Sequence, residues 1–423
     1  MRRSKLAVAT ASGAALTLGA SLIAGCAVST KDTSDGDIIK VVAQAGGPGE
    51  SLKAAAEEYT KQGLGNVSVD LFDYDGVRER TILGFNSGRD SYDVFDVAYE
   101  WMPEYIDAGY LRPMDEDIEQ RADVIDLDDF VPAYVDWATV DGTQYVLPWF
   151  GAVYMLYYRT DLLEEAGVDV PTTWEEYVDA ARTLQEATGV TGTTLIGKRD
   201  DPLMCEFWSI AWSFGADIWD GSQSTVDSPE TLEALELWKN VLSYAPQDAL
   251  SADWPAAAAA FSEGKTAMMI NFSDTTDAIL ADGVEIADKV GFALLPAGPT
   301  GVSTPNLGGH GLGISSASDK AEEAMDFIAW ATSAEQQEVG LDHGGSTNRI
   351  SLLEDPVLQE RFPYYAAALE NYRQAVYFPV TADWVDWEAA IAPSLSEGMA
   401  GTTPTADAVS AAGTNLSKLI VKE

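Results

Sequence analysis

The chain has few of the residues that build disulfide networks and metal sites. Among its 423 residues there are only two cysteines, Cys26 and Cys205, and two histidines, His310 and His343. These side chains are scattered and show no metal-ligand spacing, so we expect no metal site, and we expect no cofactor. If Cys26 is modified, Cys205 has no disulfide partner, and its apolar neighbours predict a buried side chain.

Basic residues are also scarce. The sequence has 25 Lys+Arg against 68 Asp+Glu, which gives a formal net charge of -43. No basic stripe is present to neutralise phosphates, so a nucleic-acid partner is not expected. An anionic ligand is disfavoured unless Arg78, Arg80 or Arg199 reaches it. The acidity can also be explained by solubility alone, for example in a saline habitat, and this explanation is as good as any that involves the ligand.

After the N-terminus the chain lacks any apolar run long enough to span a membrane. At the N-terminus, Arg2, Arg3 and Lys5 precede residues 6–23, which carry no ionisable side chain, and small residues lead into Cys26. This pattern resembles a bacterial lipoprotein signal, so we predict removal of residues 1–25 and lipidation of Cys26. The alternative is an uncleaved signal-anchor helix.

A lipidated Cys26 determines where the rest of the chain works. Residues 26–37 are polar and rich in small and acidic side chains, which predicts a flexible stalk. The body is then expected at the extracytoplasmic face of the cell membrane, attached by its lipid alone. The pair Arg2-Arg3 leaves the twin-arginine route open beside the general secretory route.

The body is expected to be α/β and to contain two domains, because about 400 residues exceed what one core usually supports. Strands are predicted at residues 38–43, 67–72 and 94–97, with a helix at residues 51–62 that ends at Gly63. This order predicts right-handed βαβ units and a parallel sheet. Ligands of such sheets bind beyond the carboxyl ends of the strands, so the loops after Gln44 and from Tyr99 are candidates.

Later segments are richer in helix signals. Thr173 and Glu176 form a predicted capping box, and Ser228 with Pro229 begins a second predicted helix. Residues 265–270 are predicted to form a strand. Residues 319–338 carry one apolar stripe, which predicts one long helix.

Several sequence blocks occur in an order that resembles a known family. They are residues 93–97 (DVFDV), 108–115 (AGYLRPMD), 145–149 (YVLPW), 156–167 (LYYRTDLLEEAG), 171–176 (PTTWEE), 261–268 (FSEGKTAM) and 308–314 (GGHGLGI). The chain resembles the extracellular solute-binding proteins of ABC importers, specifically the bacterial family of maltose- and other sugar-binding lipoproteins. The resemblance extends over about residues 38–400.

The resemblance implies a periplasmic-binding-protein-like fold. Two α/β lobes are then joined by a hinge and close on a ligand in the cleft between them. The expected N-terminal lobe is residues 38–147 plus 292–330. The expected C-terminal lobe is residues 148–291 plus 331–423.

Sugar recognition needs carboxylates and amides for hydroxyl groups and aromatic rings for the apolar faces. Two criteria together give a set of candidate ligand-binding residues: the family motifs, and the rule that ligands bind beyond the carboxyl ends of parallel strands, called the strand-end rule below. This set is Gln44, Tyr99, Glu100, Trp101, Trp149, Asn271, Asp274, Gly308, Gly309, Asp383 and Trp384. Trp387 competes with Trp384 for the same role, and Trp149 is equally well explained as hinge packing.

The expected function is capture of an extracellular carbohydrate and its delivery to the membrane permease of an ABC importer. We expect a monomer and no enzymatic activity, because the chain lacks nucleophile-elbow, Cys–His and phosphate-loop motifs. Within the binding class, the alternatives are a polyol, a glycerol phosphodiester or a cationic metabolite. A secreted glycoside hydrolase is the alternative from a different class.

Overall fold

The computed structural model describes residues 38–87 and 92–420. Cys26, the predicted signal of residues 1–25 and the predicted stalk of residues 26–37 lie outside this part. Within the described part, the helices are too short or too polar for any of them to cross a bilayer.

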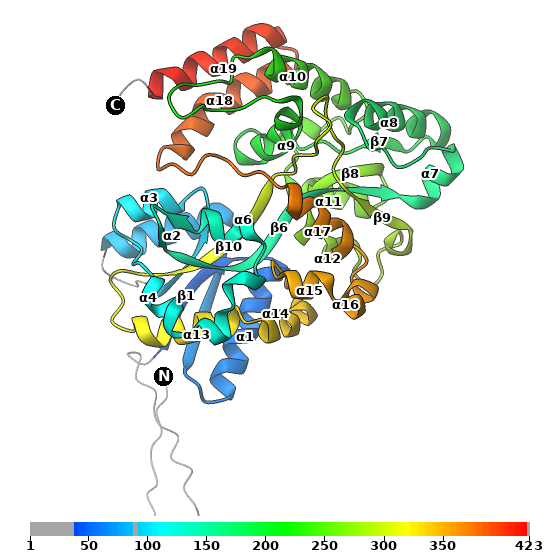
Figure 1. The fold of residues 1–423 in the computed structure, drawn as a ribbon. Coiled ribbons are helices and arrows are strands. Elements are labelled where there is room, and N and C mark those ends of the chain that lie inside the picture. The colour runs from blue at the N-terminus through cyan, green and yellow to red at the C-terminus, as the bar shows by residue number, and fades with distance from the viewer. Residues whose placement is uncertain (1–37, 88–91, 421–423) are drawn as a thin grey trace, which may run out of the picture. The chain divides into compact units, whose positions relative to one another are not determined.

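Ten strands form the sheets in the part of the chain that the structure describes. Their bounds are β1 (Ile38–Gln44), β2 (Asn66–Phe72), β3 (Val94–Ala98), β4 (Thr139–Val140), β5 (Thr143–Gln144), β6 (Val146–Arg159), β7 (Thr191–Thr193), β8 (Thr266–Phe272), β9 (Val290–Ala293) and β10 (Leu307–Ile314). The main sheet has the order β2-β1-β3-β10-β6-β8-β7, and β9 pairs with β6 (Figure 1). Strands β4 and β5 form a separate small hairpin.

The helices cover this sheet (Figure 1). Their bounds are α1 (Gly47–Lys61), α2 (Tyr74–Ser87), α3 (Met102–Asp107), α4 (Asp115–Gln120), α5 (Ala122–Ile125), α6 (Pro132–Trp137), α7 (Thr160–Ala166), α8 (Trp174–Thr188), α9 (Asp201–Ala211), α10 (Pro229–Leu242), α11 (Trp254–Ser262), α12 (Thr276–Ile279), α13 (Ala321–Ala331), α14 (Ala334–Gly340), α15 (Ile350–Glu354), α16 (Pro356–Arg361), α17 (Tyr365–Gln374), α18 (Trp384–Met399) and α19 (Thr405–Ile420).

The βαβ unit predicted at the start of the body is confirmed. Strand β1 pairs in parallel with β2 and with β3. Helix α1 begins with Pro48 in its first turn and buries Leu52, Ala56 and Tyr59 on one face, as the spacing of these residues requires. It ends just before Gly63, whose φ of 76° lets the chain turn back toward β2.

Apart from the parallel pair β7–β8, the remainder of the sheet differs from the parallel arrangement that we expected. Strand β10 is antiparallel to both β3 and β6, and β6 is antiparallel to β8 and β9. The reason is topological: β10 returns to the first half of the sheet from the second half, without a crossover helix that would restore its direction.

Strand β6 joins the two halves of the sheet. Its residues up to Val153 pair with β10, and its residues from Tyr154 onward pair with β8 and β9. In Figure 1 this strand runs from beside β10 toward β8 and β9. The chain therefore forms two α/β lobes that share one long strand.

Two predicted helix starts are confirmed and one helix prediction is wrong. Thr173 and Glu176 form the capping box of α8, and the Ser228 side chain accepts a hydrogen bond from the Thr231 N–H at the start of α10. The single helix predicted at residues 319–338 is instead two helices, α13 and α14. Ser333 adopts an extended conformation between them and caps α14 through the Gln336 N–H, so its side chain starts a new helix.

Candidate functional site

A cavity of about 480 Å³ lies at the carboxyl ends of β1 and β3 and reaches the second half of the sheet. Its walls come from both lobes. The lining residues are Gln44 to Pro48, Tyr74, Glu100, Phe150, Ala152, Asp201, Cys205, Trp254, Pro255, Ala258, Ala259, Ser262, Phe272, Asp274, Thr275, Ala278 and Gly308 to His310. A volume of this size is typical of small-molecule sites.

Aromatic side chains from four elements surround this cavity. Tyr74 of α2 and Trp254 of α11 face each other with ring centroids 6.5 Å apart. Phe272, at the end of β8, packs beside Trp254 at 5.9 Å. Phe150 of β6 packs against the imidazole of His310 at 4.9 Å. The apolar faces of a solute therefore have rings to contact in both lobes.

Trp254 is held in place by two hydrogen bonds. Its indole Nε1–H donates to the Tyr154 hydroxyl at 2.9 Å. Its backbone carbonyl accepts a hydrogen bond from the Asn271 side-chain amide at 3.0 Å. The Trp254 ring is therefore fixed before any ligand arrives.

One buried carboxylate supports the floor of the cavity. Asp96 of β3 is completely buried. Its Oδ1 accepts hydrogen bonds from Trp149 Nε1 at 3.0 Å and from His310 Nδ1 at 2.8 Å. Its Oδ2 accepts from the Gln44 N–H at 2.8 Å. A single side chain thus ties β1, β6 and β10 together directly beneath Gln44 and His310.

The carboxyl groups of Glu100, Asp201 and Asp274 line the cavity. None of them forms an ion pair with a residue that the structure describes. Burial raises the pKa of Asp201 to about 6 and that of Asp274 to about 6. Burial, together with the charge of Asp201, raises the pKa of Glu100 well above its usual range. The described lining contains no Lys or Arg, and although the interaction with His310 lowers the pKa values of Asp201 and Asp274, burial outweighs it.

Five of the eleven predicted ligand-binding residues line this cavity: Gln44, Glu100, Asp274, Gly308 and Gly309. Gln44 and Glu100 are the residues at the carboxyl ends of β1 and β3, where the strand-end rule directed attention. Their role in ligand binding stays a prediction.

Three other predicted residues lie directly behind the lining. The ring of Trp101 packs against Tyr74 with centroids 4.4 Å apart. Trp149 donates to Asp96, and Asn271 holds the backbone of Trp254. Each therefore contacts a residue that positions or forms the cavity wall.

The last three predicted residues do not line the cavity, although Tyr99 lies next to the lining residue Glu100. The Tyr99 hydroxyl accepts a hydrogen bond from the Phe378 N–H at 3.2 Å. The Trp384 ring stacks on Phe378 at 4.4 Å and is 1% exposed, so it is core packing in this structure. Asp383 is exposed at the start of α18.

Sequence reasoning missed several residues that form the site. Tyr74 follows the end of β2, so the same strand-end rule could have found it. Asp96, Asp201, Trp254 and His310 carry no local signal of this kind, because their positions depend on how distant strands and helices meet. Cys205 is buried as predicted, and its thiol contacts Asp201 Oδ1 at 3.3 Å at the edge of the cavity.

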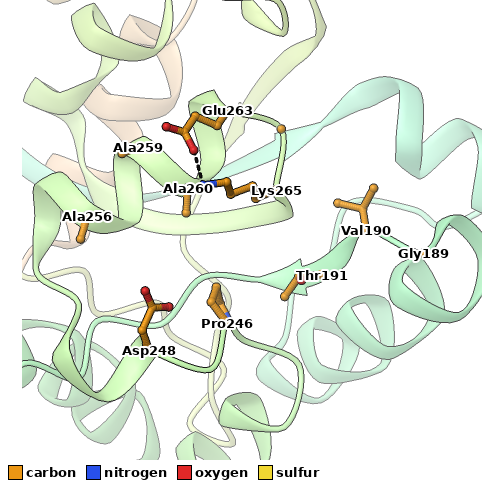
Figure 2. A pocket seen from close by; sticks show the side chains of 11 residues that line it. Gly189, Val190, Thr191, Pro246, Asp248, Ala256, Ala259, Ala260, Glu263 and Lys265 are labelled. Atoms are coloured by element: carbon orange, nitrogen blue, oxygen red, sulfur yellow. Dashed lines mark ion pairs between the residues drawn. The ribbon is translucent and has the colours of Figure 1, made fainter.

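A second hollow, of about 610 Å³, lies between the end of α8, the Pro246–Asp248 region and α11. Figure 2 shows that small alanine side chains of α11 form one edge and that Glu263 pairs with Lys265 on the rim. It contains none of the predicted site residues and no aromatic side chain. The cavity above Asp96 is therefore the candidate site.

Residues 44–338 match the family model of the bacterial extracellular solute-binding proteins. The chain belongs to this family. The assignment to the solute-binding proteins of ABC importers, which the sequence blocks predicted, is confirmed, and so is the two-lobed α/β fold of periplasmic binding proteins.

Individual relatives of this solute-binding protein agree with that assignment. It is 28% identical over 260 residues to a probable ABC transporter-binding protein of Deinococcus radiodurans, an alignment that covers 59% of this chain and 62% of that relative. Among solved structures, the maltose-bound MalE3 of T. maritima has a TM-score of 0.83 and 28% identity, covering 90% of this chain and 99% of that one. A ribitol complex of a solute-binding protein from Agrobacterium radiobacter K84 has a TM-score of 0.83 and 25% identity, covering 91% and 99%.

Proposed function

We propose that this solute-binding protein captures an extracellular carbohydrate in the cavity above Asp96 and delivers it unchanged to the permease of an ABC importer. The observation that carries the proposal is the cavity lining, which combines unpaired carboxyl groups with aromatic rings from both lobes. Carboxylates accept hydrogen bonds from hydroxyl groups, and rings cover the C–H faces of a sugar.

The lining also argues against phosphorylated solutes. A phosphate needs Arg, Lys or several free N–H donors, and the described lining has no Lys or Arg. Among the alternatives, a glycerol phosphodiester therefore fits less well than a polyol or a cationic metabolite. The likeness to a maltose complex and to a ribitol complex supports a hydroxylated solute.

Thermal-shift screening against a panel of sugars and polyols tests the proposal. A ligand that binds only the folded state raises the melting temperature, by an amount that grows with its concentration. Recovery of an intact labelled oligosaccharide after incubation separates a binding protein from a glycoside hydrolase. Shortened products would refute the proposal, and so would a panel in which no hydroxylated solute raises the melting temperature.

The proposal includes closure of two lobes, residues 38–147 plus 292–330 and residues 148–291 plus 331–423. The change of strand partners inside β6 supports a crossing within this strand; it lies near Val153 and Tyr154, a few residues after the proposed boundary at 147/148. A protein that closes on its ligand becomes more compact, so small-angle scattering at saturation should give a smaller radius of gyration. A radius that stays the same would argue against closure.

We also propose that Cys26 is lipidated after removal of residues 1–25, which anchors a monomer at the extracytoplasmic face of the membrane. Replacement of Cys26 by Ser should leave folding intact but release the protein from membranes or block its maturation. Fractionation of cells that express the variant measures this. A correctly cleaved Cys26→Ser protein that remains in the membrane fraction would overturn the anchor.

A further inference from the structure

The polar side chains of the cavity consist mainly of hydrogen-bond acceptors. Glu100, Asp201 and Asp274 offer carboxyl oxygens. Two of the potential donors are already engaged: the Trp254 indole N–H bonds Tyr154, and the Thr275 hydroxyl donates to the Phe272 carbonyl at 2.7 Å. A ligand that brings more donors than acceptors therefore complements the ionised forms of these carboxyls.

His310 adds another acceptor from an independent part of the fold. Its side chain is 7% exposed and lines the cavity. In the tautomer that donates its Nδ1–H to Asp96, Nε2 is an acceptor. Nε2 has no hydrogen-bond partner among the residues that the structure describes. A ligand donor that enters the cavity can therefore bond this nitrogen.

The negative groups are concentrated at one end of the cavity. In addition to burial, the charge of Asp201 raises the pKa of Glu100, and the charge of Asp75 of α2 raises that of Asp201. The charges of Asp201 and Glu100 both act on Glu388 of α18. Burial, followed by the charge of Asp201, raises the pKa of Glu388 to about 9. The ring of Tyr74 lies at this end, where a π face can contact a cation.

We propose that the solute carries a protonated amino group, and that its ammonium binds between Glu100 and Asp201 while its hydroxyl groups contact the rest of the cavity. An ammonium supplies three donors and no acceptor, together with the positive charge that these carboxyls lack. The inference rests on the proposed function and narrows it to amino sugars and amino polyols.

Binding of such a cation should release protons. At neutral pH, the raised pKa values keep part of the acidic groups protonated in the free protein, and the ammonium favours their ionised forms. The titratable groups that face this end are Asp75 from α2, Glu100 after β3, Asp200, Asp201 and Cys205 at α9, Glu388 from α18, and, farther along the cavity, Asp274 and His310. A neutral sugar leaves these equilibria nearly unchanged.

The test uses matched probes: glucosamine, N-acetylglucosamine and glucose, then galactosamine and galactose, then glucamine and sorbitol. Calorimetric titration at neutral pH in two buffers of different ionisation enthalpy gives the affinity and the protons released. We expect at least one amine to bind tenfold or more tightly than its uncharged counterparts, a difference of about 1.4 kcal/mol, with proton release.

Variants extend the same test. Glu100→Gln and Asp201→Asn should weaken binding of the amine by about thirtyfold, the scale for removing one partner of a buried charge pair. They should change the affinity for an uncharged counterpart much less. Asp107→Asn, at an exposed position at the end of α3, is the matched control. Melting of each ligand-free variant shows that it is folded.

Two outcomes overturn the inference. One is binding of glucose, N-acetylglucosamine or sorbitol that is equal to or tighter than binding of the matching amine. The other is the absence of binding by every amine. In either case, binding of a neutral sugar or polyol still supports the proposed function. If none of the probes binds, the result contradicts both the proposed function and the inference of an amine ligand.

Discussion

The Asp96 carboxylate accepts a hydrogen bond from His310 Nδ1 at 2.8 Å, and this contact joins the middle of β3 to the cavity. The same carboxylate also accepts from Trp149 and from the Gln44 backbone. Since Asp96 is completely buried, its two oxygens depend on these protein donors for their hydrogen bonds. The shape of the cavity floor therefore depends on one side chain that does not line the cavity.

Replacement of Asp96 by Asn should weaken both the fold and the site. An amide has one oxygen for three donors, and its NH₂ would face either the Gln44 N–H or the pair of side-chain donors. A buried unsatisfied donor costs about 1–3 kcal/mol. Denaturant unfolding without ligand measures this loss, and titration measures the weaker binding. Wild-type stability together with wild-type affinity would show that Asp96 has no supporting role.

Trp384→Ala should destabilise the ligand-free protein strongly. The ring is 1% exposed and stacks on Phe378, so its removal leaves a cavity in the core. Truncation of a buried Trp costs about 3–5 kcal/mol. Trp384→Phe keeps a stacked ring and serves as the matched control. If Trp384→Ala instead unfolds like wild type but loses ligand affinity, the sequence-based role of Trp384 as a ligand contact is correct.

The two adjacent glycines of β10 should respond differently to replacement by Ala. At Gly309, φ is 98° and an added Cβ would meet the Phe150 carbonyl oxygen at 2.6 Å, so backbone must move. We expect Gly309→Ala to cost about 1–3 kcal/mol of stability. Thermal or denaturant unfolding of the two variants side by side gives this comparison.

At Gly308 the three atoms nearest to an added Cβ all belong to the ring of Phe272, the closest at 2.6 Å. That ring lines the cavity and can turn into it, so Gly308→Ala should reduce ligand affinity more than stability. An equal loss of stability in both variants would argue against this difference between the two positions.

Glu206 should make the protein less stable as the pH rises. Burial raises the pKa of this carboxyl from 4.5 to about 8, although Trp238 Nε1–H and the Ile196 N–H both donate to it. Between these values the folded state keeps a proton that the unfolded state has released. Stability therefore falls by about 1.4 kcal/mol per pH unit in this window and levels off above it.

Denaturant unfolding at several pH values measures this slope. Glu206→Gln removes the titration and should flatten the curve. It should also be less stable than wild type in acid, because one amide oxygen replaces two acceptors for the same two N–H donors. Identical slopes in wild type and variant would show that Glu206 is not the group that titrates.

Local sequence signals predicted the elements whose boundaries depend on neighbouring residues. Helix boundaries were predicted from the capping residues Thr173 and Ser228 and from the helix stop at Gly63. Strands β1, β2 and β3 were predicted from their apolar patterns. The antiparallel return of β10 depends on where a distant segment re-enters the sheet, which no window of sequence contains. The break at Ser333 was missed because the prediction extended the helix to residue 338, although the apolar stripe ends at Ala331 and Ser333 carries a capping signal.

The same distinction applies to the site. The strand-end rule located Gln44 and Glu100, because it depends only on strand direction. The aromatic residues of the site were harder to identify from the sequence, because a Trp is equally compatible with a cavity wall and with a buried core. Trp101 packs behind Tyr74, and Trp254 forms the wall itself, a difference that only the packing of α2 against α11 decides.

The most direct test of the account is calorimetric titration of the solute found by screening onto wild type, Trp254→Ala and Trp330→Ala. Trp254 forms the cavity wall, whereas Trp330 packs on Tyr59 of α1, away from it. We predict one binding site, a loss of about tenfold or more in affinity for Trp254→Ala, and little change for Trp330→Ala. Wild-type affinity in Trp254→Ala would contradict the account, because the solute would then bind outside the cavity above Asp96.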